Sequence, residues 1–152
     1  MAKKNANKRK MRKVERGDVL YVDFGKRIDG SVQAGIRPCV VVSNNISSNY
    51  STTLCVCPFT TKIKYNPVHV VIHTDEVQGY LERDSDVLPE QIVTISKNKV
   101  LGKIGHINNN SSTMKKINFV LAKQLGLEGY EKEWIEDATE KEGRGKEKVC
   151  QV

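Results

Sequence analysis

The sequence lacks any hydrophobic run long enough to cross a membrane. A spanning helix needs about 20 consecutive apolar residues, and no stretch of the 152 residues approaches that length. The basic N-terminus is not followed by the apolar segment that a secretory signal contains. We therefore expect a cytoplasmic protein with no membrane partner.

Cysteine and histidine are scarce, with four and three residues respectively, and their spacing does not fit a metal site. Cys55 and Cys57 lie two apart on an expected strand, so they share a face and are not placed to pair with each other. No second cysteine pair is present to complete a zinc site. His69 and His73 also share a strand face but lack a third ligand. We expect free thiols in a reducing compartment and no metal or other cofactor.

Several catalytic motifs are absent as well. The chain has no glycine-rich phosphate loop, no HExxH motif and no GxSxG motif. It contains no internal repeats, and its length is that of one domain, sufficient to bury a core without disulfides. Any chemistry must therefore come from residues that separate loops bring together.

The formal net charge of +7 is concentrated at the N-terminus. Residues 1–13 carry seven lysines and arginines and no acid, whereas the rest of the chain carries 18 bases and 18 acids. We expect a disordered basic arm over 1–13, a nearly neutral folded domain over 14–128 and a charged tail over 129–152. The arm either adds salt-dependent affinity for nucleic acid or serves as a solubilising tail.

Short β-rich runs dominate the expected domain. Strands are expected over residues 19–24, 37–43, 52–59, 68–72, 87–96 and 100–107, with a break in the third at Pro58. Residues 44–51 are expected to form a polar loop with nothing to hold it. Residues 74–86 are charged and are expected to be irregular.

One helical pattern follows the strands. It begins near Ser111 or Ser112, which are good N-caps, and ends at Gly126. Apolar residues between these limits fall at helical spacing, as expected for a face packed on the core: Met114, Ile117, Val120, Leu121 and Leu125. Together the elements predict an α+β fold, a small β-barrel of about five to seven short antiparallel strands with one C-terminal helix.

The segment GSVQAGIRPCVVVS, residues 30–43, places an arginine between a flexible loop and an apolar strand. Pro38 restricts Arg37 to extended backbone angles, and the run that follows suits a buried strand. A permanently charged guanidinium at the rim of a core, beside a loop, suits phosphate binding. The alternative is an ordinary exposed arginine at the start of a strand.

Further polar residues stand at strand ends, where they can converge on one site. They are Ser31, Gln33, Arg37, Thr60, Thr61, Lys62, Lys64, Glu90 and Gln91. Hydroxyls and cations opposite an arginine suit a pentacoordinate phosphorane, because they place donors and positive charge where negative charge develops. Taken alone, a Thr-Thr-Lys triplet also occurs on many protein surfaces.

Five blocks, in this order, resemble the MazF/PemK (Kid-like) toxins of type II toxin–antitoxin systems. The blocks are RGDVLYVDF, GSVQAGIRPCVVVS, CPFTTK, PVHVVI and LPEQIVTI, within residues 15–126. The resemblance implies an SH3-like barrel that forms a homodimer and cleaves single-stranded RNA without a metal. The implied cleavage uses the neighbouring 2′-hydroxyl and leaves a 2′,3′-cyclic phosphate and a free 5′-hydroxyl. The implied protein partner is a cognate antitoxin whose disordered acidic segment covers the RNA groove.

The resemblance also assigns roles to individual positions. Its catalytic arginine falls on Arg37, expected to stabilise the phosphorane, and its catalytic threonine falls on Thr60, expected to hydrogen-bond a phosphate oxygen. Electrostatic stabilisation is the expected role of the arginine, because the pKa of an arginine, above ~12, makes it a poor acid or base. The positions expected to bind RNA are Ser31, Gln33, Thr61, Lys62, Lys64, His69 and Gln91.

One position departs from the family pattern. The family loop reads Gly-Ser-Glu-Gln, and Val32 stands where the acid is expected. Glu90 stands where some relatives carry a catalytic aspartate, so it is the expected catalytic substitute; the alternative is a solvated carboxylate at a strand end. Two rival functions remain open, namely a DNA gyrase poison of similar fold and a catalytically silent RNA-binding relative.

Overall fold

The computed structural model describes residues 13–27, 29–127 and 129. Its strands are β1 (Asp18–Asp23), β2 (Ile36–Val41), β3 (Thr53–Thr60), β4 (Val70–Ile72), β5 (Gln78–Gly79), β6 (Ser85–Val87), β7 (Val93–Ser96) and β8 (Val100–His106). Its helices are α1 (Asn45–Tyr50) and α2 (Ser112–Gln124), and single 3-10 turns cover Thr74–Glu76, Pro89–Gln91 and Lys97–Lys99. Nearly all of the expected basic arm and C-terminal tail lies outside the described residues.

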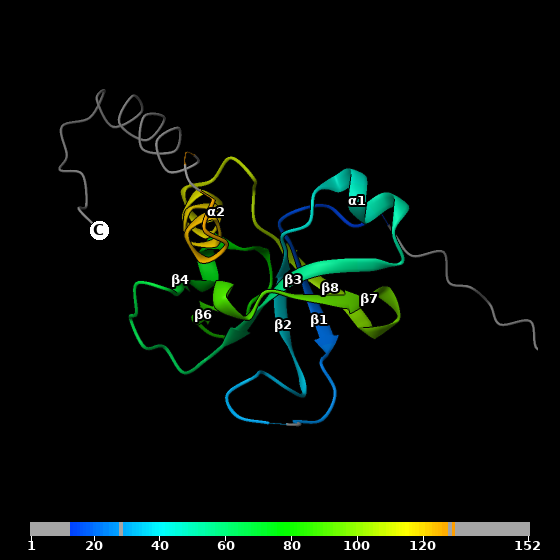
Figure 1. The fold of residues 1–152 in the computed structure, drawn as a ribbon, viewed down its shortest axis with the longest axis horizontal. Helices are drawn as coiled ribbons and strands as arrows, with labels where there is room; N and C mark the ends of the chain where they lie inside the picture. Colours follow the sequence, from blue (N-terminus) through cyan, green and yellow to red (C-terminus); the bar gives the residue numbers. More distant parts are fainter. Residues whose placement is uncertain (1–12, 28, 128, 130–152) are drawn as a thin grey trace, which may run out of the picture.

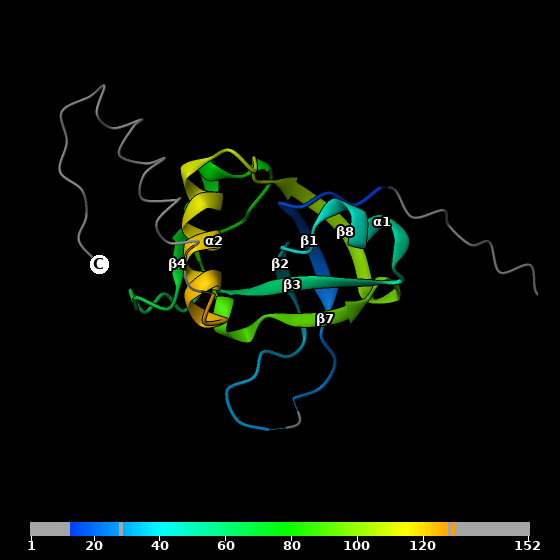
Figure 2. The same ribbon diagram turned by 45° about the horizontal axis from the view of Figure 1, so that its top comes forward.

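The strands form an antiparallel sheet in the order β4-β6-β3-β2-β1-β8-β5, and β7 also pairs with β3. Figure 2 shows β1, β3, β7 and β8 curling around a common interior, while α2 lies outside the curled sheet. The two views agree that α2 stands beside β4, far from α1 (Figure 1). The predicted α+β barrel with a C-terminal helix is confirmed.

The sheet buries apolar side chains on both faces, because consecutive residues of a strand point to opposite sides. Leu20 and Val22 of β1 lie inside the curled sheet, whereas Val19 belongs to the cluster packed under α2. The interior cluster also contains Cys39, Val41, Leu54, Val56 and Ile95. The domain therefore has two adjoining cores that share one sheet.

α2 begins and ends close to the positions that the sequence predicts. The Ser111 hydroxyl accepts the Met114 N–H at 3.2 Å, and Gly126 follows the helix with a φ of +66°. Met114 and Ile117 are fully buried, which fixes α2 against the sheet. No helix in the described part of the chain is long and apolar enough to span a membrane.

Residues 44–51 contain a helix, so the expectation of an unsupported polar loop is wrong. Asn44 caps α1, its side-chain oxygen accepting the Ser47 N–H at 2.8 Å. Ser48 is buried, and the Lys97 ammonium donates to its carbonyl. Polar side chains satisfy the backbone locally here, and such a device leaves no hydrophobic pattern in the sequence.

β3 continues through Pro58 to Thr60, so the expected break at Pro58 is also wrong. One edge of β3 changes its partner at this point, since Val56 is the last residue paired with β7 and Phe59 the first paired with β6. Pro58 falls between the two pairings, where its missing N–H interrupts no ladder. Its carbonyl, on the same edge, accepts the Leu88 N–H at 3.0 Å.

The expected strand over residues 87–96 is divided for the same reason. β6 ends at Val87, a 3-10 turn covers Pro89–Gln91, and β7 follows. β6 and β7 each pair with a different part of β3. The expectation that residues 74–86 are irregular is wrong as well, because they contain β5 and most of β6, with Asp86 fully buried. These additions bring the strands of the described chain to eight.

Arg16 ties the barrel to α2. Its Nε donates to the Val42 carbonyl at 2.9 Å, and its terminal nitrogen donates to the Asn118 side-chain oxygen at 2.7 Å. Burial lowers the pKa of Arg16 from its ordinary value. The guanidinium thus joins the chain before β1 to β2 and to the helix.

Arg16→Met should destabilise the fold by about 2 kcal/mol, because it leaves two half-buried acceptors without a charged donor. Urea denaturation monitored by circular dichroism measures this change in the free energy of unfolding. Lys26→Ala, at an exposed site, is the matched control and should stay within about 0.5 kcal/mol of wild type. Equal stability of the two variants would contradict the role of Arg16.

Candidate functional site

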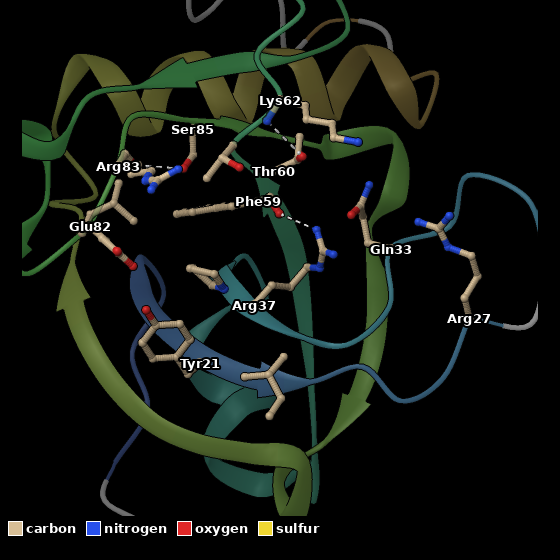
Figure 3. A pocket seen from close by; sticks show the side chains of 14 residues that line it. Tyr21, Arg27, Gln33, Arg37, Phe59, Thr60, Lys62, Glu82, Arg83 and Ser85 are labelled. Atoms are coloured by element: carbon tan, nitrogen blue, oxygen red, sulfur yellow. Dashed lines mark hydrogen bonds between the residues drawn. The ribbon is translucent and has the colours of Figure 1, made fainter.

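A cleft of about 550 Å³ opens where β2 begins and β3 ends. Figure 3 shows the side chains around it. Five predicted site residues line this cleft: Gln33, Arg37, Thr60, Thr61 and Lys62. Its lining also includes Tyr21, Arg27, Glu82 and Arg83. Four cations and one carboxylate therefore line the cleft, and this balance favours an anionic ligand.

Arg37 is held by backbone carbonyls. Its Nε and one terminal nitrogen donate to the Ala34 carbonyl at 3.0 and 2.9 Å, and the other terminal nitrogen donates to the Phe59 carbonyl at 3.1 Å (Figure 3). Partial burial, and then the neighbouring charge of Arg27, lower its pKa from the ordinary value. A guanidinium has five N–H groups, and three of them are used here. Two remain for a phosphate, and no carboxylate pairs with Arg37 within the described chain.

Thr60 is the last residue of β3 and lines the cleft. Its hydroxyl oxygen accepts the Lys62 N–H at 3.3 Å, which orients the side chain and leaves the hydroxyl hydrogen available. Thr60 is half-buried, whereas Thr61 and Lys62 are exposed. The end of β3 therefore presents one oriented hydroxyl and one exposed cation to a ligand.

Three charged residues of the cleft were not predicted from the sequence. Glu82 and Arg83 lie on one side of it and Arg27 on the other, with Arg37 between them (Figure 3). Arg27 lies in a loop, and the other two precede β6 in a segment without a recognised motif. The one available signal was the density of charge, which many solvated surfaces share.

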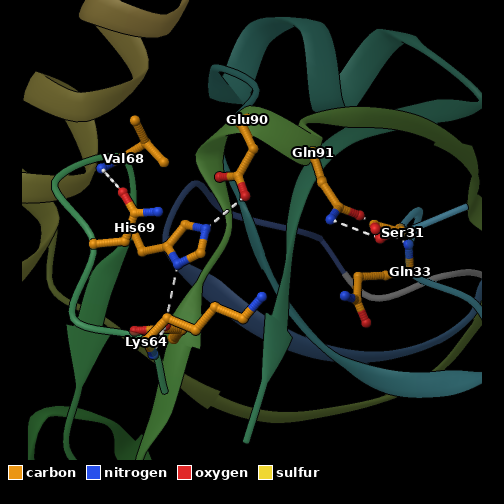
Figure 4. Close-up of polar contacts among 9 residues, drawn as sticks. Ser31, Gln33, Lys64, Val68, His69, Glu90 and Gln91 are labelled. Carbon is orange, nitrogen blue, oxygen red and sulfur yellow. Dashed lines mark hydrogen bonds and ion pairs between the residues drawn. The ribbon is translucent and has the colours of Figure 1, made fainter. Parts of the chain in front are cut away.

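A second group of predicted residues lies next to the cleft and is organised by Gln91. Its side-chain oxygen accepts the Gln33 N–H at 2.8 Å, and its side-chain nitrogen donates to the Ser31 carbonyl at 3.1 Å (Figure 4). This two-point contact fixes the loop that precedes Arg37. The Val32 side chain between the two contacts is 67% exposed.

His69 lies between two carboxylates in the same group. Its Nε2 is 2.6 Å from Glu90 Oε1, and its Nδ1 is 3.1 Å from Asp86 Oδ2 (Figure 4). The Lys64 backbone N–H donates to the same Asp86 oxygen at 2.8 Å. Asp86 was not predicted, because it lies in the charged segment that the sequence indicates to be irregular.

The ten predicted site residues thus divide into two adjoining groups. One lines the cleft around Arg37 and Thr60. The other comprises Ser31, Lys64, His69, Glu90 and Gln91, none of which lines the cleft. Gln33 joins the groups, because its side chain lines the cleft and its backbone is bound by Gln91. The catalytic and RNA-binding roles of all ten remain predictions.

The described residues contain no cluster of three or more histidines, cysteines or acids placed to hold a metal ion. Cys39, Cys55 and Cys57 are free thiols. Burial raises the pKa of Cys39 to about 12 and raises that of Cys57 as well. These two thiols therefore stay protonated at neutral pH and are poor nucleophiles.

The sequence model of a protein family, the PemK-like, MazF-like toxins of type II toxin–antitoxin systems, matches residues 15–125. The chain belongs to this family. It is 35% identical over 114 residues to endoribonuclease EndoA of Bacillus subtilis, and this alignment covers 75% of this chain and 96% of that relative. It is 32% identical over 114 residues to endoribonuclease MazF of Staphylococcus saprophyticus, with 75% and 92% covered. The resemblance predicted from five sequence blocks is confirmed.

A solved structure supports the same assignment. It is an endoribonuclease in complex with its cognate antitoxin from a mycobacterial species, with a TM-score of 0.60 and 26% identity. The match covers 77% of this chain and 97% of that one. The barrel and the helix α2 are therefore features of the MazF-like toxin fold.

Gln91→Ala should release the loop before Arg37. Loss of two hydrogen bonds, worth about 1 kcal/mol each, should speed exchange of the Gln33 amide by roughly 5–30-fold. Hydrogen exchange followed by NMR measures this rate. Gln124→Ala, at the exposed end of α2, is the control, and an unchanged Gln33 rate in Gln91→Ala would show that Gln91 does not hold the loop.

His73 and Asp84 form an exposed pair whose contribution depends on pH. Their hydrogen bond, with Nδ1 and Oδ2 2.9 Å apart, raises the pKa of His73 and lowers that of Asp84. Because the folded-state pKa of His73 is raised, its stabilisation is present below the ordinary histidine pKa and is lost as pH rises through the folded value. The Tm difference between wild type and Asp84→Asn should therefore be larger at pH 6 than at pH 9. Equal differences at both pH values would contradict this linkage.

Proposed function

We propose that the chain is the toxin of a toxin–antitoxin system and acts in the cytoplasm as a sequence-specific endoribonuclease on single-stranded RNA. The observation that carries this proposal is the cleft that Arg37 and Thr60 line together with three further cations. Two relatives at 32% and 35% identity bear the name endoribonuclease. We propose a homodimer that needs no metal and is neutralised by a cognate antitoxin.

The proposed chemistry is transesterification by the RNA itself. The 2′-oxygen attacks the adjacent phosphorus, the new P–O2′ bond forms, and the P–O5′ bond breaks. The products are a 2′,3′-cyclic phosphate and a 5′-hydroxyl. One proton must leave the 2′-hydroxyl for a proton acceptor, and solvent water supplies the proton that the departing 5′-oxygen takes up.

Arg37 and Thr60 are proposed to stabilise the negative charge of the phosphorane. The two unused N–H groups of Arg37 suit two equatorial oxygens, and the Thr60 hydroxyl suits a third contact. Neither side chain is a proton acceptor at neutral pH. We therefore assign the 2′-hydroxyl proton to a carboxylate next to the cleft.

Glu90 is the proposed acceptor, in place of the acid that Val32 replaces. Glu90 directly precedes Gln91 in the 3-10 turn Pro89–Gln91, and Gln91 holds the loop that leads to Arg37. RNA running from the cleft across this loop would reach both groups of predicted residues. The side chains proposed to bind it are Ser31, Gln33, Thr61, Lys62, Lys64, His69 and Gln91.

The test incubates the purified protein with a long single-stranded RNA in EDTA, with end-group analysis of the products. Wild type should cut at a specific sequence and leave cyclic-phosphate ends. Arg37→Lys keeps the charge but loses the guanidinium fork, and Thr60→Val loses the hydroxyl. Each should lower the single-turnover rate by about 10²–10³-fold.

Lys26→Ala is the control for this experiment, because Lys26 is exposed and does not line the cleft. It should cut at the wild-type rate. A folded wild-type protein that leaves the RNA intact would refute the nuclease proposal. RNA binding without cleavage would then identify a catalytically silent relative, and DNA gyrase inhibition would identify a gyrase poison.

A further inference from the structure

Asp86 is a fully buried carboxylate that the proposed chemistry leaves unassigned. It lies in β6, directly opposite Thr60 in the pairing with β3. Its Oδ2 accepts the Lys64 backbone N–H at 2.8 Å and lies 3.1 Å from His69 Nδ1, whereas its Oδ1 has no partner among the described residues. Burial of a carboxylate is costly unless a charged partner offsets it. The arrangement therefore requires a cation, and His69 is the group in contact.

The positions of the two carboxylates favour a doubly protonated His69 ring. A neutral imidazole has one N–H and one lone pair, yet both nitrogens of His69 lie within 3.1 Å of carboxylate oxygens. With both carboxylates ionised, a neutral ring would direct a lone pair against the lone pairs of Asp86 or Glu90. An imidazolium donates to both carboxylates at once. The group of three then carries one net negative charge instead of two, which lowers its repulsion of RNA phosphates.

We propose that Asp86 is a positioning residue that holds His69 as an imidazolium, and that His69 in turn fixes the Glu90 carboxylate beside the cleft. This inference rests on the proposed function, in which Glu90 accepts the 2′-hydroxyl proton. In serine proteases a buried aspartate also orients a histidine, and it stabilises the imidazolium that forms during the reaction. Here the histidine orients a carboxylate.

The two carboxylate oxygens of Glu90 have different surroundings. Its Oε1 is engaged at 2.6 Å, whereas Oε2 is shielded from solvent and has no partner among the described residues. The Glu90 side chain as a whole is 28% exposed. The contact with His69 therefore sets the orientation of this carboxylate before RNA binds.

Asp86→Asn removes the negative charge that faces His69 while keeping the shape of the side chain. The asparagine oxygen can still accept the Lys64 N–H, but the negative charge that holds the second proton on His69 is gone. A neutral His69 donates from one nitrogen, so Glu90 is no longer held by an imidazolium. We expect kcat to fall by about 10²-fold, the contribution of one oriented acid–base group, while KM stays within about twofold.

Asp84→Asn is the matched control. Asp84 also pairs with a histidine nitrogen, at 2.9 Å from His73 Nδ1, but this pair is exposed and does not line the cleft. The same substitution therefore removes an aspartate–histidine pair from the same region of the chain without touching Glu90. Its kcat and KM should match those of wild type.

The experiment combines cleavage kinetics with ¹⁵N NMR of the histidine rings at pH 7 and with thermal melts. The proposal expects two protonated ring nitrogens on His69 in wild type and in Asp84→Asn, and one in Asp86→Asn. A folded Asp86→Asn protein with wild-type kcat would overturn it. A wild-type His69 ring with one protonated nitrogen would also overturn it, whether or not Asp86→Asn folds.

The failures of this inference and of the proposed function are distinguishable. Wild-type protein that leaves RNA intact refutes the nuclease proposal, and with it a catalytic purpose for Asp86, His69 and Glu90. The ¹⁵N spectrum of the histidine rings still shows whether Asp86 keeps His69 doubly protonated. Wild-type cleavage with an equally active, folded Asp86→Asn protein leaves the nuclease standing and removes the positioning role.

Discussion

The exchange of partners along one edge of β3 is the constraint on which the rest of the structure depends. β2 pairs with one edge of β3, while β7 and then β6 pair with the other. The exchange occurs at Pro58, where a residue without an N–H interrupts no ladder. It sends β7 around the barrel interior and β6 toward α2, so that two cores form on one sheet.

The same exchange places the chemical groups. The Phe59 carbonyl, at the end of β3, accepts from Arg37 at the start of β2. Thr60 follows and faces Asp86 across the pairing with β6. The turn between β6 and β7 then carries Glu90 and Gln91 to the loop that precedes Arg37. Residues from four separate segments therefore meet because a single strand has two successive neighbours.

Much of the fold was predictable because its signals are local. Helical spacing and a serine cap predicted α2, and an apolar run after Pro38 predicted β2. The errors were non-local. Pro58 was expected to break β3, but a proline does not disturb a strand at the point where the strand changes partners. Residues 87–96 were expected to form one strand because both halves of this segment are apolar. α1 was missed because its stability comes from a cap and buried polar contacts, not from an apolar stripe.

The sequence by itself determined the family, the barrel class and the placement of Arg37 and Thr60 near strand ends, because each depends on short blocks whose residue types and order are visible. Only the tertiary structure decided the surroundings of the acids. Asp86 is charged and stands in a charged segment, yet strand pairing buries it completely. The sequence indicated Glu90 as a catalytic residue or a solvated carboxylate, and the structure places its Oε1 2.6 Å from His69 Nε2. Burial and hydrogen-bond partners arise from residues distant in the chain, so the environment of an ionisable group follows from the packed structure and not from its neighbours in sequence.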